Sequence, residues 1–155
     1  MKCLVIFYSR TGCTRKAAKS IAASLKADLA EVFEKKKRHG VLGFVFAGRD
    51  AMKKALVEII EPRHEPDSYD CVVVGTPVWA GSMVPAIRTY IEKNSSRFKS
   101  VAFFACGSSE QGQSFFQEMS KVSGKEPVAT VCFRDKEVKD DSFESKVPGF
   151  AAKLE

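Results

Sequence analysis

The chain alternates short apolar runs with segments of helical periodicity, and this alternation limits the folds open to it more than any other feature. Five short segments are predicted as strands, at about residues 2–8, 29–34, 70–75, 100–105 and 128–133. The predicted helices lie between or after them, at about residues 13–27, 83–95, 112–123 and within 141–154. Such alternation predicts an α/β fold, with helices on both faces of a parallel sheet and right-handed crossovers.

Length and composition favour one domain without a membrane span. A chain of 155 residues with 45% hydrophobic residues can bury one sizeable core, so we expect a single domain over residues 1–155. No apolar run approaches the ~20 residues of a span. The N-terminus enters a strand without a signal peptide, so we expect a cytoplasmic protein. The five cysteines are odd in number and lack C-x-x-C spacing, which argues against structural disulfides and a metal site.

The end of the first predicted strand carries an expected anion site. Leu4–Tyr8 is apolar, Ser9–Thr14 is rich in hydroxyl groups, and a helical pattern follows at once. A strand that turns directly into a helix aims unpaired N–H groups and the positive end of the helix dipole at one point, where phosphate is favoured. Ser9, Thr11 and Thr14 would add donors. Helix capping explains one such residue well, but not three around a glycine.

The pattern of this loop excludes several kinds of phosphate site. It has neither the G-x-x-x-x-G-K-[ST] pattern of nucleoside-triphosphate loops nor the G-x-G-x-x-G pattern of dinucleotide folds. No cysteine stands five residues before an arginine, which argues against a cysteine phosphatase. Ser9 and Arg10 stand where a receiver domain would need acidic residues.

What remains resembles the flavodoxin family, whose first loop reads as an aromatic or aliphatic residue followed by S-x-T-G-x-T, here Tyr8 and the six residues after it. The resemblance implies a doubly wound, five-stranded parallel sheet of strand order 2-1-3-4-5, in the short-chain version of the fold, with flavin beyond the carboxyl ends of the strands. It also implies that this loop holds the phosphate of FMN, through Ser9, Arg10, Thr11, Gly12, Cys13 and Thr14.

A second loop supports the same resemblance. Its residues match T-P-x-W-x-G, which flavodoxin-like proteins place against the flavin ring: Thr76, Pro77, Val78, Trp79, Ala80 and Gly81. The only Trp of the chain would be badly exposed in this loop unless something flat, such as an isoalloxazine, covered it. The alternative is that Trp79 anchors the loop onto the body of the protein. A turn around Ala80 and Gly81 would be of type II, which suits Gly at the third position.

A third loop, Cys106–Gly112, follows the fourth predicted strand, and the resemblance places Cys106, Gly107 and Ser108 at the flavin. We expect Cys106 to be a small buried residue rather than a redox thiol. Many flavodoxins carry a Tyr here that covers the outer flavin face, but none occurs between Cys106 and Phe116. An open outer face argues against a simple electron carrier and would suit a nicotinamide ring.

Two segments are harder to interpret. A basic run, Lys35–Arg38, precedes an apolar stretch, and Arg49–Ile60 has a helical pattern. The apolar stretch either packs into the core or forms a semi-exposed flap or dimer surface. The basic run stands alone without interleaved aromatic residues, so we do not expect nucleic-acid binding. Near the C-terminus, Pro148 should delay or kink the last helix.

The sequence leaves two redox functions and one other open. The first is an FMN-binding electron carrier between redox partner proteins. The second is an FMN-dependent NAD(P)H oxidoreductase that reduces a quinone or similar small acceptor, and the third is a flavin-free interaction module. Flavin would carry the electrons, so we expect no catalytic residue. The net charge of +6 favours anionic nucleotides or an acidic redox protein. The oligomeric state stays open.

Overall fold

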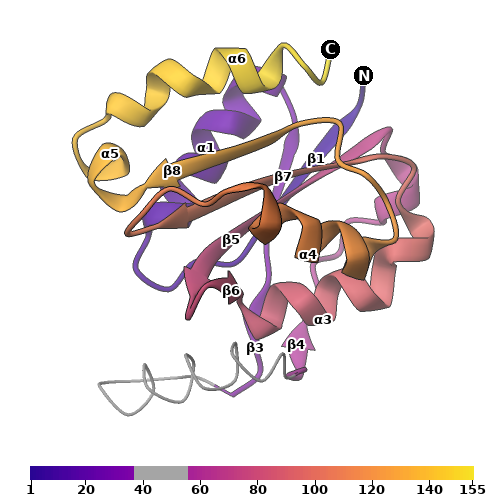
Figure 1. Cartoon of the computed structure of the whole chain (residues 1–155). Coiled ribbons are helices and arrows are strands. Elements are labelled where there is room, and N and C mark those ends of the chain that lie inside the picture. Colours follow the sequence, from indigo (N-terminus) through magenta and orange to yellow (C-terminus); the bar gives the residue numbers. More distant parts are fainter. Residues whose placement is uncertain (37–55) are drawn as a thin grey trace.

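A computed structural model describes residues 1–36 and 56–155, and its centre is a parallel sheet between two layers of helices (Figure 1). The sheet has the order β2-β1-β5-β7-β8, and all four pairings along it are parallel. Its strands are β1 (Cys3–Phe7), β2 (Asp28–Glu31), β5 (Cys71–Trp79), β7 (Val101–Gly107) and β8 (Thr130–Arg134). The predicted doubly wound sheet with strand order 2-1-3-4-5 is therefore confirmed.

The central strands are buried on both faces because their side chains alternate between two hydrophobic cores. In β1, Leu4 and Ile6 belong to one core, whereas Val5 and Phe7 belong to the other. Strands β5 and β7 divide their side chains in the same way. Continuous apolar runs are what strands covered on both faces require, and this explains the pattern that predicted them.

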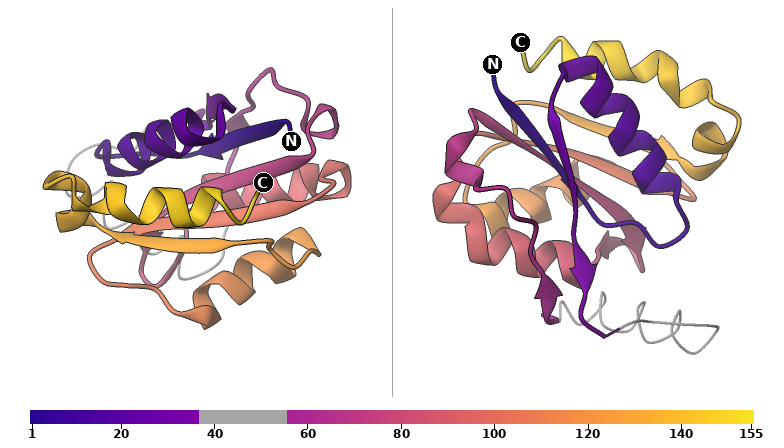
Figure 2. Two further views of the ribbon diagram at one scale, coloured as in Figure 1. Left: turned by 90° about the horizontal axis from the view of Figure 1, so that it is seen from above. Right: turned by 180° about the vertical axis from the view of Figure 1, so that it is seen from behind.

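Helices of two separate layers close the two cores (Figure 2). Side chains of α3 (Pro85–Asn94) and α4 (Gln113–Ser123) fill the first core. Side chains of α1 (Cys13–Leu25), α5 (Asp135–Lys139) and α6 (Val147–Ala151) fill the second. The short helix α5 was not predicted.

The C-terminal part of the chain shows the predicted effect of Pro148. A 3₁₀ helix, Ser142–Lys146, comes first, and α6 starts only at Val147 with the proline in its first turn. The ring of proline fits the first turn of a helix because no N–H is needed there. Within the described residues, no helix has the length and apolar character needed to cross a membrane.

One part of the fold departs from the expectation. The predicted strand at 29–34 divides, and its last residues form β3 (Phe33–Glu34), which pairs antiparallel with β4 (Ile59–Ile60) in a separate small sheet. The end of the helix predicted over Arg49–Ile60 is therefore wrong. One isoleucine of β4 is buried and the next exposed, as in a strand with one covered face. The predictions for the apolar stretch before it lie outside the described residues.

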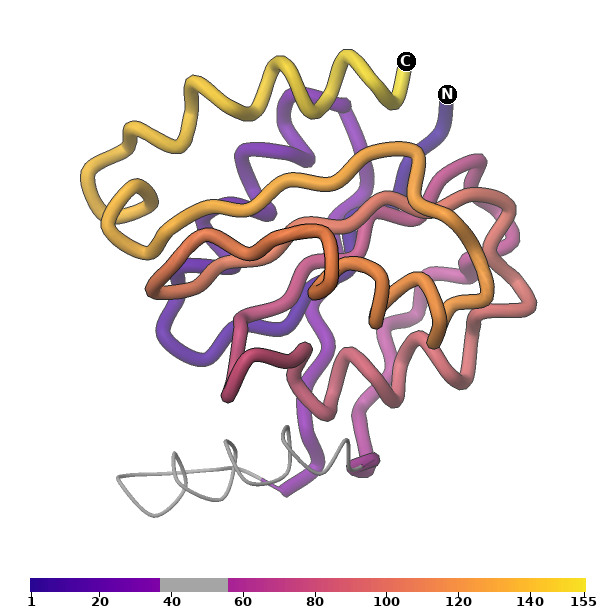
Figure 3. The backbone as a smooth tube through the Cα atoms, viewed as in Figure 1, coloured from indigo at the N-terminus to yellow at the C-terminus, as the bar shows by residue number. Residues whose placement is uncertain are grey.

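The two chain ends lie close together, at the end of the sheet where β1 begins (Figure 3). The carboxyl ends of the parallel strands, with the loops that follow them, lie at the opposite end. The termini and the predicted binding loops are thus on different sides of the molecule.

Candidate functional site

Three loops meet at the carboxyl end of the sheet because the strands that carry them, β1, β5 and β7, are neighbours. In the register of the sheet, Phe7 lies beside Gly75, and Gly75 lies beside Phe104. Just beyond, the N–H of Tyr8 donates to the carbonyl of Gly75 at 3.3 Å. The structure therefore brings the three predicted loops to one edge.

The first loop enters α1 through Gly12. Its φ of 101° lies in the left-handed region that glycine adopts without strain. The Gly12 N–H donates to Ser9 Oγ at 3.1 Å, which closes the turn. Gly12 is the N-cap, and no side chain of residues 1–36 or 56–155 caps α1. The N–H groups of Cys13, Thr14 and Arg15 therefore have no helical acceptor, and they leave a site for an anion.

The side chains of this loop lie at different depths. Thr11 is exposed, and Ser9, Arg10 and Cys13 are partly exposed. Thr14 is buried, and its hydroxyl is in hydrogen-bonding contact with the thiol of the third loop. Thr14 thus connects the first loop to the third, while the side chain of Thr11 faces the solvent.

Two cations anchor the first turn of α1, and the sequence analysis missed both. Arg15 binds Glu31 of β2 with two hydrogen bonds, Nε to Oε2 at 3.1 Å and Nη2 to Oε1 at 2.7 Å. The bond to Glu31 raises the pKa of the Arg15 guanidinium. Lys16 Nζ donates to the Val138 carbonyl at 2.8 Å and pairs with Asp141 at 2.6 Å. Nothing in the sequence signals these partners, because they come from distant elements.

The second loop is a β-hairpin rather than an irregular loop. Strand β5 continues through Trp79, which pairs with Ser82 of β6 (Ser82–Met83). Ala80 and Gly81 form the turn, with φ of 49° and 73°. Positive φ at both central residues is characteristic of a type I′ turn, whose twist fits a two-residue hairpin. The predicted type II turn is wrong, because the requirements of strand pairing outweigh the local preference for Gly at the third position.

Trp79 is covered by the protein itself. Its side chain is only 8% exposed and belongs to the core that includes Met83. Its ring meets Tyr8 edge to face, with 5.6 Å between the centroids. This burial agrees with the alternative that Trp79 anchors the loop onto the body of the protein, because Trp79 lies in a paired strand whose core-facing side it occupies. The contact with Tyr8 connects the first loop to the second.

Thr76 holds the base of the hairpin. Its side chain is fully buried, and its hydroxyl donates to the Pro77 carbonyl at 2.7 Å. The same hydroxyl accepts the N–H of Val84 at 3.1 Å, just after β6. Thr76 was predicted as a cofactor-binding residue, and these internal bonds indicate that it positions the hairpin.

The third loop packs directly against the hairpin. A Cβ on Gly107 would lie 3.2 Å from Cβ and Cγ2 of Val78, so glycine permits this close approach. Cys106 is 2% exposed, and burial raises the pKa of its thiol far above the usual range. The low exposure and the raised pKa of Cys106 agree with the prediction that it is a small buried residue rather than a redox thiol. Ser108 is exposed beside them.

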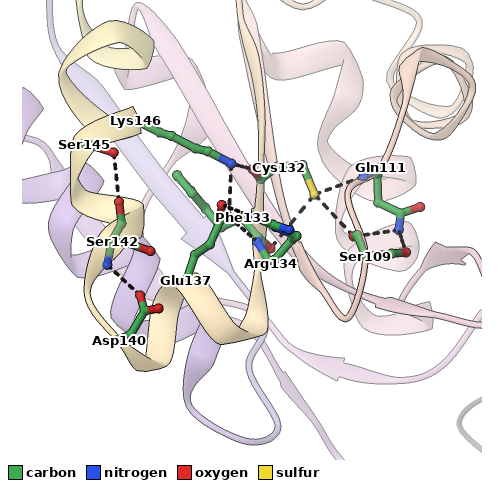
Figure 4. Close-up of polar contacts among 10 residues, drawn as sticks. All are labelled: Ser109, Gln111, Cys132, Phe133, Arg134, Glu137, Asp140, Ser142, Ser145 and Lys146. Carbon is green, nitrogen blue, oxygen red and sulfur yellow. Dashed lines mark hydrogen bonds and ion pairs between the residues drawn. The ribbon is translucent and has the colours of Figure 1, made fainter.

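Strand β8 supports the third loop from the side (Figure 4). The N–H of Gln111 donates to Cys132 Sγ at 3.3 Å. Where β8 ends, Glu137 accepts the backbone N–H of Arg134 at 2.9 Å and pairs with Lys146 at 3.0 Å. Hydrogen bonds from Arg134, followed by the effect of Lys146, lower the pKa of Glu137 to about 2. The carboxylate thus fixes the turn from β8 into α5.

The sequence matches the family described as Flavodoxin over residues 2–129, most of the chain. The chain belongs to the flavodoxin family. Among curated proteins, no sequence matches it significantly.

Solved structures of flavodoxins and flavoproteins share this fold. A flavoprotein from Lactobacillus acidophilus NCFM in complex with FMN is similar, with a TM-score of 0.74 and 23% identity over 91% of this chain and 98% of that one. Two-electron reduced flavodoxin of Megasphaera elsdenii gives a TM-score of 0.60 and 17% identity over 99% of both chains. A flavodoxin from Streptococcus pneumonia TIGR4 gives 0.60 and 15% identity, over 99% of this chain and 97% of that one.

In this member of the flavodoxin family, each of the three loops touches the other two. Tyr8 meets Trp79, Gly107 meets Val78, and the third loop reaches back to Thr14. The three loops that carry the predicted residues therefore form one connected cluster. Its exposed members are Thr11, Ala80, Gly81 and Ser108, and its buried supports are Thr14, Thr76, Trp79, Cys106 and Gly107.

Proposed function

We propose that this chain binds FMN at the three loops and carries electrons between redox partner proteins. The observation that carries the proposal is the start of α1, where Gly12 is the N-cap and the described part of the chain supplies no side-chain cap for the first-turn N–H groups. Uncapped N–H groups at the positive end of a helix fit a phosphate group. The residues that would hold it are those of the first loop, Ser9, Arg10, Thr11, Gly12, Cys13 and Thr14.

The hairpin and the third loop would border the flavin ring. Their exposed tips, Ala80, Gly81 and Ser108, are the parts accessible to a ligand, with Pro77, Val78, Trp79, Cys106 and Gly107 behind them. When bound, FMN supplies the electron-transfer chemistry, and the protein supplies binding, orientation and electrostatics. Membership of the flavodoxin family and the FMN of the Lactobacillus flavoprotein support this assignment.

Calorimetric titration with FMN and with riboflavin tests the phosphate site. FMN should bind much more tightly, because riboflavin lacks the phosphate that the first loop would hold. Ser9→Ala should weaken FMN binding by about tenfold or more, through loss of a charge-assisted hydrogen bond. Thr14→Ala should weaken it as well, because the buried Thr14 side chain supports the first loop against Cys106. Ser24→Ala, at an exposed position of α1, is the matched control. Equal affinities for the two flavins would contradict the proposal.

A second candidate function is that of an FMN-dependent NAD(P)H oxidoreductase acting on a quinone or similar acceptor. It is favoured by the third loop, which has no Tyr between Cys106 and Phe116 and exposes Ser108–Glu110. Such a loop leaves room beside the flavin for a nicotinamide ring, and the net charge of +6 would attract the nucleotide. Anaerobic bleaching of the flavin by NADPH or NADH, at a rate that saturates with nucleotide, would favour the enzyme. Bleaching by dithionite or a partner protein alone would favour the carrier.

We also propose that the protein is cytoplasmic. All five cysteines are free, as expected in a reducing compartment. Detection of the native protein in fractionated cells would check this location.

A further inference from the structure

A compact polar network lies beside the hairpin and joins it to both helices of one layer. Ser82 of β6 lies between Arg88 of α3 and Glu118 of α4. Ser82 Oγ donates to the Glu118 carboxylate, whose oxygens lie 3.1 and 3.0 Å away. Arg88 Nη2 donates to Glu118 Oε1, and its distance to Ser82 Oγ is 3.5 Å. The three side chains thus contact one another in a ring.

Because this network is buried, removing one of its charged side chains should destabilise the protein. The side chain of Arg88 is 6% exposed and that of Glu118 is 19% exposed. A buried guanidinium without its carboxylate is strongly destabilising, because its desolvation is no longer compensated. Arg88 therefore fixes where the Glu118 carboxylate lies, and the carboxylate fixes the hydroxyl of Ser82.

Ser82 is next to both the turn and Trp79, so a contact that fixes Ser82 also restrains the turn and the indole. It follows Gly81 directly, and it is the cross-strand partner of Trp79. Ala80, at the start of the turn, has a left-handed backbone, which a non-glycine residue keeps only when its surroundings enforce it. The bonds of Thr76 hold the base of the hairpin near Val84, and the network holds the strand next to the tip.

We propose that Glu118, oriented by Arg88, is a positioning residue that holds Trp79 and the Ala80–Gly81 turn in place through Ser82. The consequence for flavin binding rests on the proposed function, but the placement of the hairpin does not. Glu118 and Arg88 themselves need not touch the cofactor.

The fluorescence of Trp79 in the flavin-free protein tests the placement directly, because it is the only Trp in the chain. Ser82→Ala removes the hydroxyl and leaves the Arg88–Glu118 pair in place. We expect a shift of the emission maximum to longer wavelength and stronger quenching by acrylamide, while the protein stays folded by circular dichroism. Ser96→Ala, at an exposed position, should leave both properties unchanged.

A double-mutant cycle separates positioning from stability. Glu118→Met alone should lower the free energy of unfolding, because the Arg88 charge loses its carboxylate. Combined with Arg88→Met it should recover most of that loss, because an apolar pair can replace a buried ion pair. Trp79 should nevertheless remain as strongly quenched as in Ser82→Ala, since Ser82 still has no carboxylate to hold it. Glu92→Gln, an exposed position of α3, controls for charge.

Unchanged Trp79 emission and quenching in folded Ser82→Ala would overturn the proposal, as would a return to wild-type quenching in the double variant. Titration with FMN gives a separate result, in which Ser82→Ala should weaken binding by about tenfold. If the unmodified protein binds no FMN, the proposed function fails, while the Trp79 measurements still decide the role of Glu118.

Discussion

Ala80 has a backbone conformation that alanine on its own disfavours. Its φ of 49° belongs to the left-handed region, which costs a non-glycine residue about 1–2 kcal/mol. It is exposed, so no packing of its methyl group offsets that cost. The hairpin keeps this backbone because a two-residue connection needs positive φ at both central positions.

Replacing Ala80 by Gly should therefore stabilise the protein. Relief of the left-handed strain outweighs the extra chain entropy of glycine, and we expect the free energy of unfolding to rise by about 0.5–1 kcal/mol. Urea unfolding measures the difference. Ala23→Gly, at an exposed position inside α1, should instead lower stability by about 1 kcal/mol. Equal losses in both variants would show that the turn is not strained.

Glu137 should give the protein part of its dependence on pH. Its pKa is lowered from 4.5 to about 2 in the folded state. The stabilisation is therefore fully present above about pH 5 and is lost as the pH falls toward 2. Glu137→Gln should lower the free energy of unfolding at pH 7 by about 1–3 kcal/mol.

Urea titrations of the Glu137→Gln variant at pH 7, 4 and 3 follow this effect. The gap between wild type and variant should narrow as the pH falls. Glu126→Gln, at an exposed position, is the control for loss of one carboxylate. A gap that stays constant with pH would mean that Glu137 does not titrate differently in the folded and unfolded states.

At the scale of elements, the site depends on how closely the hairpin and the third loop approach each other. Gly107→Ala would place a methyl group 3.2 Å from Val78, and we expect a loss of about 1–3 kcal/mol through overpacking. Combination with Val78→Ala should restore part of it by making room. Gly112→Ala should cost far less, because no heavy atom of the described residues lies within 4 Å of the added Cβ. Thermal or urea unfolding of the three variants measures these losses, and equal losses in Gly107→Ala and Gly112→Ala would contradict a tight contact between Gly107 and Val78.

Sequence reasoning found the elements whose signals are local. Buried strands read as unbroken apolar runs, and the first loop could be located because its hydroxyl groups follow such a run. Pro148 could be interpreted because its effect on a helix acts within one turn. What these features share is that the physical cause lies within a few residues of the effect.

The features that sequence reasoning missed depend on partners far along the chain. The pairing of Trp79 with Ser82 converted a predicted loop into a hairpin and buried the indole. The bidentate bond of Arg15 needs Glu31, and the fit of Gly107 needs Val78. Ile59–Ile60 became a strand because β3 lies beside it. Each of these outcomes is decided by tertiary contact rather than by local propensity.

At the scale of the whole molecule, a ligand that joins the three loops should stabilise the fold cooperatively. FMN at a free concentration of about one hundred times its Kd adds about 2.7 kcal/mol to the free energy of unfolding. For a chain of this length, that corresponds to a rise in Tm of about 5–11 °C.

Differential scanning fluorimetry with FMN, riboflavin and inorganic phosphate measures this rise. At equal concentrations riboflavin should give a smaller shift than FMN, since it lacks the group expected at α1. An equal rise in Tm with riboflavin would mean that the phosphate contributes nothing to binding, which would contradict the phosphate site at α1.

The position of the chain ends has a practical consequence. They lie close together and away from the three loops (Figure 3), so a short linker could join them while the chain is opened elsewhere. Close, exposed ends are the condition under which circular permutation is usually tolerated. A redox domain fused at either end would be tethered behind the site and would leave the loops free. The two termini and the three loops thus lie at opposite ends of the molecule, so a fusion at the termini need not obstruct the loops.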